Sequence, residues 1–167
     1  MDEPKIEESP SVIAIIPMKP LVESKTRLNR SFTREQRADL ALGMLARVIS
    51  AVRGAAVGLF WVVGGDERVR NLTRNSDGVW LEDMGRNLND TLAQSFDRAF
   101  KQGHSAMYLA ADLPFLKTSD VHSVLQASRR QSNICLAPAR RDGGTNAILV
   151  PAGTPFLPEL GPLSFIR

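Results

Sequence analysis

Short apolar runs alternate along the chain with segments in which apolar residues recur at helical spacing. The apolar runs are short and continuous, and the first is rich in β-branched residues, which is typical of strands buried in a sheet. They occupy residues 12–16, 57–63, 79–81, 106–110, 134–137 and 147–150. Apolar residues recur at helical spacing in three segments. The first extends from a Thr33/Gln36 capping box to Gly54 and the second from about residue 90 to Gly103. The third begins at a predicted cap, Thr118 or Ser119.

This alternation predicts an α/β protein, in which a largely parallel sheet carries helices on both faces. Such sheets bind ligands at the carboxyl ends of their strands, so we expect the functional residues to follow directly after strands. Polar and glycine-rich stretches do follow the first, third, fourth and fifth predicted strands. The length suits one domain over residues 12–167, preceded by a flexible tail over residues 1–11.

The composition excludes several classes of protein. No apolar stretch approaches the roughly 18–20 residues that span a bilayer, and residues 1–11 lack a signal-peptide pattern, so we expect a cytoplasmic protein without membrane contact. The single cysteine, Cys135, excludes an internal disulfide, and its apolar neighbours predict a core thiol. A net charge of +3, dispersed basic residues and 6% aromatic content favour a small phosphorylated ligand over nucleic acid.

Three cations, Lys19, Lys25 and Arg27, lie in one loop after the first predicted strand. An ammonium group holds phosphate as a point charge, and a guanidinium group can bind two oxygens at once. A solvated basic loop explains the same residues about equally well. The loop is not a Walker A motif, because no G-x-x-x-x-G-K-[ST] pattern is present.

Asp112 follows the fourth predicted strand directly, and Pro114 prevents further strand pairing. A carboxylate at this position points toward the ligand cleft and suits Mg²⁺, which takes oxygen ligands and neutralises phosphates. The alternative is that Asp112 caps the following turn or helix. We expect metal binding.

Two other segments are less specific. Residues 142–146 read Asp-Gly-Gly-Thr-Asn, which suits either close backbone approach to an anion or an ordinary hairpin turn. Residues 87–91 open a predicted helix whose first turn could bind an anion or read a base. Simple N-capping by Asn87 or Asn89 is an equally good interpretation.

A series of five motifs in chain order is more specific than any one of them. The motifs are Pro17-Met18-Lys19, Ser24-Lys25-Thr26-Arg27-Leu28, Ala111-Asp112-Leu113-Pro114, Asp142-Gly143-Gly144-Thr145-Asn146 and Gly161-Pro162-Leu163-Ser164-Phe165. From residue 12 to the end, the chain resembles the 2-phospholactate guanylyltransferase family of coenzyme F420 biosynthesis. The resemblance implies a three-layer, Rossmann-like mixed sheet similar to the nucleotide-diphospho-sugar transferases.

The resemblance also implies an activity: transfer of GMP from GTP to 2-phospho-L-lactate or phosphoenolpyruvate, with release of pyrophosphate. By motif, Lys19, Lys25 and Arg27 would hold the triphosphate, with Lys25 and Asp112 catalytic and Asp112 binding Mg²⁺. The segment carrying Asn87 and Asn89 would lie near the guanosine. Thr145, Gly161 and Ser164 would hold the carboxylate of the phosphorylated acid.

Several points stay open at the level of sequence. Family members continue past the Ser-Phe segment, through a histidine and a further acidic stretch, whereas this chain stops at Arg167, so we expect the C-terminal part of the family domain to be absent. A related enzyme acting on a sugar phosphate or a molybdopterin is one rival, although Pro17-Met18-Lys19-Pro20 replaces the glycine-rich loop of those relatives. A non-catalytic nucleotide- or anion-binding module is the other. The sequence is compatible with more than one oligomeric state, including a homodimer.

Overall fold

The structure is a computed structural model and describes residues 11–23, 31–55, 57–140 and 143–165. These residues form six strands, four α-helices and one 3₁₀ helix. The strands are β1 Val12–Met18, β2 Leu59–Gly64, β3 Val79–Leu81, β4 Ser105–Leu109, β5 Cys135–Ala139 and β6 Gly144–Val150. The helices are η1 Leu21–Glu23, α1 Arg34–Gly54, α2 Glu67–Asn75, α3 Leu88–Lys101 and α4 Thr118–Ala127. No helix in the described ranges is long and apolar enough to cross a membrane.

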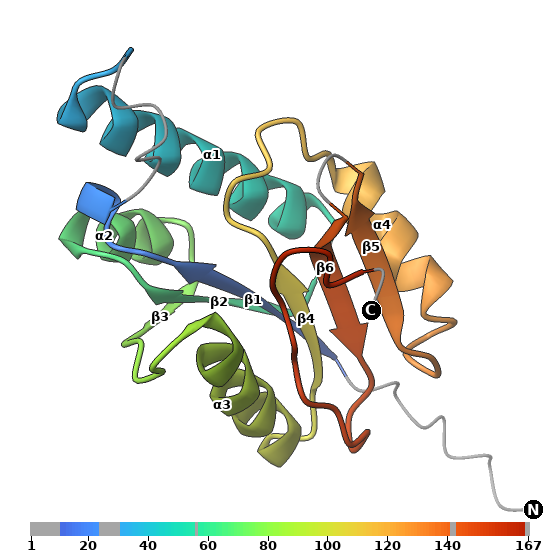
Figure 1. Ribbon diagram of the computed structural model, residues 1–167. Helices are drawn as coiled ribbons and strands as arrows, with labels where there is room; N and C mark the ends of the chain where they lie inside the picture. The colour runs from blue at the N-terminus through green and yellow to red at the C-terminus, as the bar shows by residue number, and fades with distance from the viewer. Residues whose placement is uncertain (1–10, 24–30, 56, 141–142, 166–167) are drawn as a thin grey trace, which may run out of the picture.

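The six strands form one mixed sheet in the order β3-β2-β1-β4-β6-β5. Strands β1 to β4 are parallel to one another. Strand β6 pairs antiparallel with β4, and β5 pairs antiparallel with β6. The predicted α/β class and the largely parallel sheet are therefore confirmed, with β6 as the strand that runs in reverse (Figure 1).

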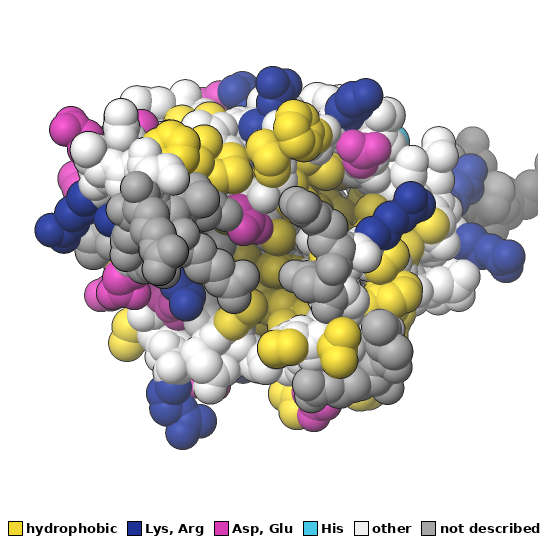
Figure 2. All heavy atoms as spheres, turned by 45° about the horizontal axis from the view of Figure 1, so that its top comes forward, with side chains coloured by type: hydrophobic (Ala, Val, Ile, Leu, Met, Phe, Trp, Pro, Cys, Tyr) yellow, Lys and Arg dark blue, Asp and Glu magenta, His cyan; other side chains and the backbone are white. Residues whose placement is uncertain are grey.

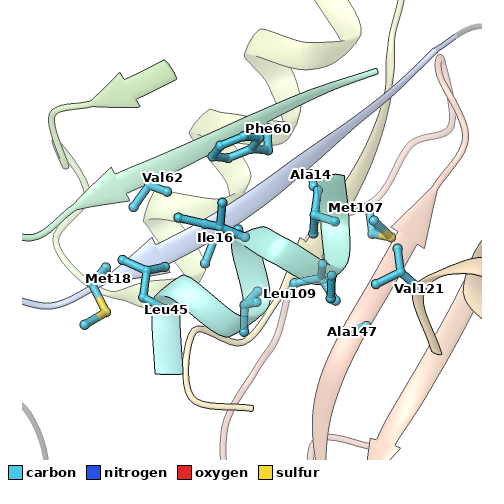
Figure 3. Packing of buried hydrophobic residues seen from close by; sticks show 14 of the residues in the cluster. Ala14, Ile16, Met18, Leu45, Phe60, Val62, Met107, Leu109, Val121 and Ala147 are labelled. Carbon is cyan, nitrogen blue, oxygen red and sulfur yellow. The ribbon is translucent and has the colours of Figure 1, made fainter. Parts of the chain in front are cut away.

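Alternate residues of each central strand enter two separate cores. On one face, Ala14, Ile16 and Met18 of β1 pack with residues of β2, β4 and β6 beneath α1, α2 and α4 (Figure 3). On the other face, Ile13 and Ile15 pack with α3. The C-terminal segment lies on this second face too, since its Phe156 and Leu160 pack against the same cluster. The protein thus has three layers, as predicted.

The N-terminal caps of α1 and α3 match the sequence signals. Thr33 and Gln36 form the predicted capping box at the start of α1. The side-chain oxygen of Asn87 accepts a hydrogen bond from the backbone N–H of Asp90 at the start of α3. The predicted cap of α4 is wrong, because Thr118 lies inside the helix and Lys117 precedes it. There the carboxylate of Asp120 accepts a 2.8 Å hydrogen bond from the Lys117 N–H.

Helix α2 is not among the elements predicted from the sequence. Val69 and Thr73 are its buried residues, so its apolar stripe is too thin to show as periodicity. Its start is nevertheless well defined, because the Asp66 side chain accepts hydrogen bonds from the N–H groups of Arg68 and Val69. The second oxygen of Asp66 accepts from the Leu21 N–H, which joins α2 to the segment that follows β1.

The prediction of Cys135 as a core thiol in a buried strand is only partly right. Strand β5 lies at the edge of the sheet, and the neighbouring Ile134 and Leu136 are 39% and 43% exposed. Cys135 itself is half-buried against the first core, and burial raises the pKa of its thiol. An apolar run does not distinguish an edge strand from a central one, because both bury at least one face.

Gly64, the last residue of β2, allows two segments of backbone to approach each other closely. It has φ of +85°, and a Cβ added there would lie 2.6 Å from the carbonyl oxygen of Met18 and 3.2 Å from Cβ of Asp83. Both neighbours lie at carboxyl ends of strands, next to the cleft described below. A side chain at this position would therefore force the ends of these strands apart.

We predict that Gly64→Ala lowers the free energy of unfolding by about 2 kcal/mol or more, because a left-handed alanine costs roughly 1–2 kcal/mol before the clash is counted. Chemical denaturation measures the change. Gly43→Ala is the matched control: Gly43 lies in α1 with nothing within 4 Å of an added Cβ. That variant should gain about 0.5–1 kcal/mol. Equal stability of the two variants would contradict the role given to Gly64.

Candidate active site

A cleft of about 770 Å³ opens at the carboxyl ends of β1, β3 and β4 and at the start of α3. Its walls come from segments that directly follow strands, as a parallel sheet requires. The charged residues that line it are Lys19, Glu23, Asp83, Arg86 and Asp112. Figure 2 shows the face turned forward from the top of Figure 1, where hydrophobic side chains line a hollow and charged side chains surround it.

The structure brings Lys19 and Asp112 to the same cleft. Lys19 follows β1 and Asp112 follows β4 by three residues, and these two strands pair in parallel from Val12↔Ser105 to Ile15↔Tyr108. An ammonium and a carboxylate therefore face one ligand space from neighbouring strands. Lys25 and Arg27, the other two predicted triphosphate ligands, lie outside the described residues.

Carboxylates outnumber cations among the described charged groups of the cleft. Glu23, Asp83 and Asp112 stand against Lys19 and Arg86. The described residues contain no group of three or more His, Cys, Asp or Glu side chains placed to hold a metal ion. A divalent cation at this cleft would therefore take one or two carboxylates and complete its oxygen ligands from elsewhere, which is the usual way that Mg²⁺ binds with a phosphorylated ligand.

The first turn of α3 forms one wall of the cleft. Asn87 lines it, and its side-chain oxygen is already engaged in capping the helix. Asn89 has a different partner: its amide donates to the carbonyl of Leu160 at 3.0 Å, and its oxygen accepts from the Leu160 N–H at 2.6 Å. This two-bond pairing, the Asn89–Leu160 clasp, ties α3 to the C-terminal segment. Base recognition by Asn89 remains a prediction, and its amide is committed to the clasp in this structure.

Asp83 and Thr91 build the opposite part of this wall. One oxygen of Asp83 accepts hydrogen bonds from the Thr91 hydroxyl at 2.7 Å and from the Gly85 N–H at 2.9 Å. Gly85 fits only without a side chain, since a Cβ there would lie 2.5 Å from the backbone nitrogen of Thr91. The Asp83 carboxylate is therefore held in a defined position at the edge of the cleft. The polar residues after β3 are the only sequence signal that accompanies this bonding pattern.

Tyr108 also lines the cleft, and sequence reasoning did not identify it. It lies within the apolar run that forms β4 and is 6% exposed, with its ring in the second core. Burial, and secondarily the negative charge of Asp112, raise the pKa of Tyr108 to about 12. Its phenol is therefore a neutral hydrogen-bond donor near pH 7. An isolated tyrosine in a hydrophobic run carries no distinctive sequence signal.

The three residues predicted to bind an acid's carboxylate lie in one place. The hydroxyl oxygens of Thr145 and Ser164 are 3.0 Å apart and share a hydrogen bond. Gly161 opens the turn that carries Ser164, whose N–H donates to the Gly161 carbonyl at 3.1 Å. The Phe165 N–H then donates to the carbonyl of Gly143. Contact of these residues with a ligand remains a prediction.

Strands β5 and β6 pair as a hairpin, with Ala139 opposite Gly144. The Gly143 N–H donates to the Ala139 carbonyl, and Gly143 has φ of +65°. The hairpin interpretation of the glycine-rich motif is thus confirmed for its backbone, while Asp142 lies outside the described residues. The following strand adjoins the cleft, because the Ala110 N–H donates to the Asn146 carbonyl at 2.9 Å.

Solved structures share this fold, among them a protein classed as a nucleotide-diphospho-sugar transferase. A protein classed as such a transferase from Desulfovibrio desulfuricans G20 matches with a TM-score of 0.67 at 18% identity, over 86% of this chain and 64% of that chain. A 4-diphosphocytidyl-2C-methyl-D-erythritol synthase matches with a TM-score of 0.55 at 13% identity, over 86% and 76% of the two chains. At such identities the likeness establishes the fold: a Rossmann-like mixed α/β sheet.

Sequence comparison defines the family more narrowly. Residues 12–165 match the family described as guanylyl transferase CofC like, and the chain belongs to that family. It is 35% identical over 158 residues to a phosphoenolpyruvate guanylyltransferase of Rubrobacter xylanophilus, covering 93% of this chain and 76% of that protein. It is 33% identical over 160 residues to a 3-phospho-D-glycerate guanylyltransferase of Phenylobacterium zucineum, covering 92% and 73%.

A third relative is a 2-phospho-L-lactate guanylyltransferase of Methanocaldococcus jannaschii, which is 28% identical over 135 residues. That match covers 80% of this chain and 57% of the relative. The chain therefore spans between about half and three quarters of these relatives. Their names differ in the acid and agree in the guanylyl group.

We predict that Tyr108 of the folded, ligand-free protein ionises at about pH 12 in place of 10.0. Absorbance of the phenolate reports this residue alone, because the chain has one tyrosine. Between these pH values the unfolded chain releases a proton that the folded protein keeps, so stability falls as the pH rises through this range. Protein in denaturant is the control and should titrate near 10. Titration of the folded protein near 10 would show that the phenol is not buried.

Proposed function

We propose that the chain transfers GMP from GTP to a small phosphorylated carboxylic acid, 2-phospho-L-lactate or phosphoenolpyruvate, with release of pyrophosphate, in coenzyme F420 biosynthesis. The observation that carries the proposal is the presence of Lys19 and Asp112 at one cleft, on adjacent parallel strands. Membership of the guanylyl transferase family and the guanylyltransferase names of its relatives supply the nucleotide and the reaction.

The reaction needs little covalent chemistry from the protein. A phosphate oxygen of the acceptor attacks the α-phosphorus of GTP, a new P–O bond forms, and the bond to the bridging oxygen of the β-phosphate breaks, so that pyrophosphate leaves with the electron pair. Lys19 would hold the phosphates as a point charge, and Lys25 and Arg27 are proposed to assist it. The residues accelerate the step mainly by positioning the two substrates and balancing charge.

The donor set of the cleft fits Mg²⁺. Asp112 supplies a hard oxygen ligand, and its carboxylate would repel a triphosphate beside it in the absence of a divalent ion between them. Bound there, Mg²⁺ would neutralise the phosphate oxygens as charge moves to the leaving group. Asp112 is therefore proposed as the metal-binding residue, with its position set by β4 and Pro114.

The acceptor would bind on the other side of residues 110–112. Thr145 and Ser164 offer hydroxyl groups, and the Gly161 turn offers small-residue backbone that an anion can approach. The acids named for the relatives all combine a carboxylate with a phosphate, which matches one donor-rich site beside the cleft that Lys19 lines. We place the reaction in the cytoplasm, where the free Cys135 thiol would stay reduced.

A substrate panel with pyrophosphate release as the readout tests the proposal. With Mg²⁺ present, we expect GTP to turn over in preference to ATP, CTP and UTP, and only when a phosphorylated acid is added. The acids are 2-phospho-L-lactate, phosphoenolpyruvate and 3-phospho-D-glycerate, with glucose 1-phosphate as the control that lacks a carboxylate. Equal turnover of ATP and GTP would refute the guanylyl assignment. Nucleotide binding without turnover on any acid would favour a binding module.

We predict that Asp112→Asn reduces Mg²⁺-dependent turnover about 100-fold or more, because it removes the charge that holds the ion and keeps the side-chain shape. The ligand-free protein should melt close to the parent temperature. Asp97→Asn is the control: this carboxylate lies on the exposed face of α3, paired with Lys101, and its loss should leave turnover unchanged. Asparagine caps helices and turns as well as aspartate, so undiminished activity in Asp112→Asn would assign Asp112 a capping role.

A further inference from the structure

Tyr108 has a buried ring and a hydroxyl group that has no hydrogen-bond partner among the described residues. The residue is 6% exposed and its ring belongs to the second core. Among the described residues, no hydrogen bond joins its hydroxyl to another group, although a buried tyrosine usually has such a partner. In the described structure, this oxygen is not among the fully buried side-chain atoms that lack a hydrogen-bond partner, so it keeps some contact with solvent. Since Tyr108 lines the cleft, the cleft is where this oxygen meets solvent.

The residues that line the cleft differ in charge from one part of it to another. Lys19 approaches from the end of β1, while Tyr108 faces the wall built from the start of α3 and the Asp83 loop. This wall carries the Asp83 carboxylate and the hydroxyl of Thr91. Its cation, Arg86, is 89% exposed and is paired with Asp90. The Asp112 carboxylate also acts on Tyr108, so phosphates are favoured near Lys19 and Asp112, and an uncharged ligand group is favoured on the side of Tyr108 that faces Asp83 and Thr91.

We infer that the Tyr108 hydroxyl donates a hydrogen bond to the nucleoside half of the bound nucleotide, and so acts as a positioning and specificity residue for the nucleotide site. The inference rests on the proposed function. A purine nucleoside presents ring nitrogen, carbonyl and ribose oxygen acceptors, and the phenol keeps its proton at neutral pH. A neutral donor can bind such atoms without attracting phosphate more strongly. An additional lysine, in contrast, would favour phosphate over them.

Tyr108→Phe tests the inference, because it removes the hydroxyl and keeps the ring in the core. We expect Kd for GTP and for guanosine to rise about fivefold to tenfold, as for the loss of one neutral hydrogen bond. Kd for inorganic triphosphate, which lacks the nucleoside, should stay unchanged, and so should KM for the acid acceptor. Ser123→Ala is the matched control, since its hydroxyl bonds to Ser119 on the exposed face of α4. That variant should bind all four ligands like the parent.

The melting temperature of ligand-free Tyr108→Phe adds an independent readout. It should equal or exceed that of the parent, because no protein hydrogen bond is lost with the hydroxyl. A fall of several degrees, or equal loss of triphosphate affinity, would overturn the inference. Unchanged GTP and guanosine binding in Tyr108→Phe would overturn it while leaving the proposed function intact. A parent protein that binds no nucleotide would overturn both.

Discussion

Parallel pairing of β1 with both β2 and β4 is the interaction on which the geometry of the cleft depends. Strand β3 joins the same parallel set through β2, so β1, β3 and β4 end at one edge and deliver Lys19, Asp83 and Asp112 to one space although they are far apart in sequence. The pairing is stabilised from both sides, since alternate residues of β1 enter the cores under α1 and α3. A slip of one residue would exchange the two faces and bury the wrong set of side chains.

Pro17 shows how the strand end is adapted to this role. The sequence places it after the first strand, whereas in the structure β1 continues to Met18 with Pro17 opposite Val63 of β2. Proline is tolerated there because the β4 ladder has already ended at the Ile15–Tyr108 pair, so its missing N–H costs no pairing on that side. The loop that carries Lys19 thus leaves from a stiff, partly paired backbone.

Most of the layers could be predicted from the sequence, because apolar runs and capping residues act locally. The alternation of runs and the Thr33/Gln36 box located the central strands and α1 correctly. Strand direction could not be predicted for β6, since an antiparallel strand has the same apolar pattern as a parallel one. Helix α2 was missed because it buries little, and its Asp66 cap alone is a weak signal.

The residues of the candidate site likewise differ in whether a local sequence signal predicts them. Lys19 and Asp112 could be predicted to meet, because both follow buried strands of one parallel sheet. Tyr108 could not, because its position in an apolar run resembles that of any core residue. That its hydroxyl has no hydrogen-bond partner in the described part of the chain is evident only in three dimensions. The family resemblance grouped Thr145 with Ser164, whereas spacing alone gives no reason for residues 19 apart to meet.

The Asn89–Leu160 clasp has a thermodynamic consequence for the two halves of the site. It joins the first turn of α3, which borders the cleft, to the segment that carries Ser164, through two hydrogen bonds across 71 residues of chain. Any ligand that orders one of these segments also reduces the conformational entropy left to lose at the other. Binding at the two sites is then positively cooperative, and linkage requires that each ligand strengthen the binding of the other by the same factor.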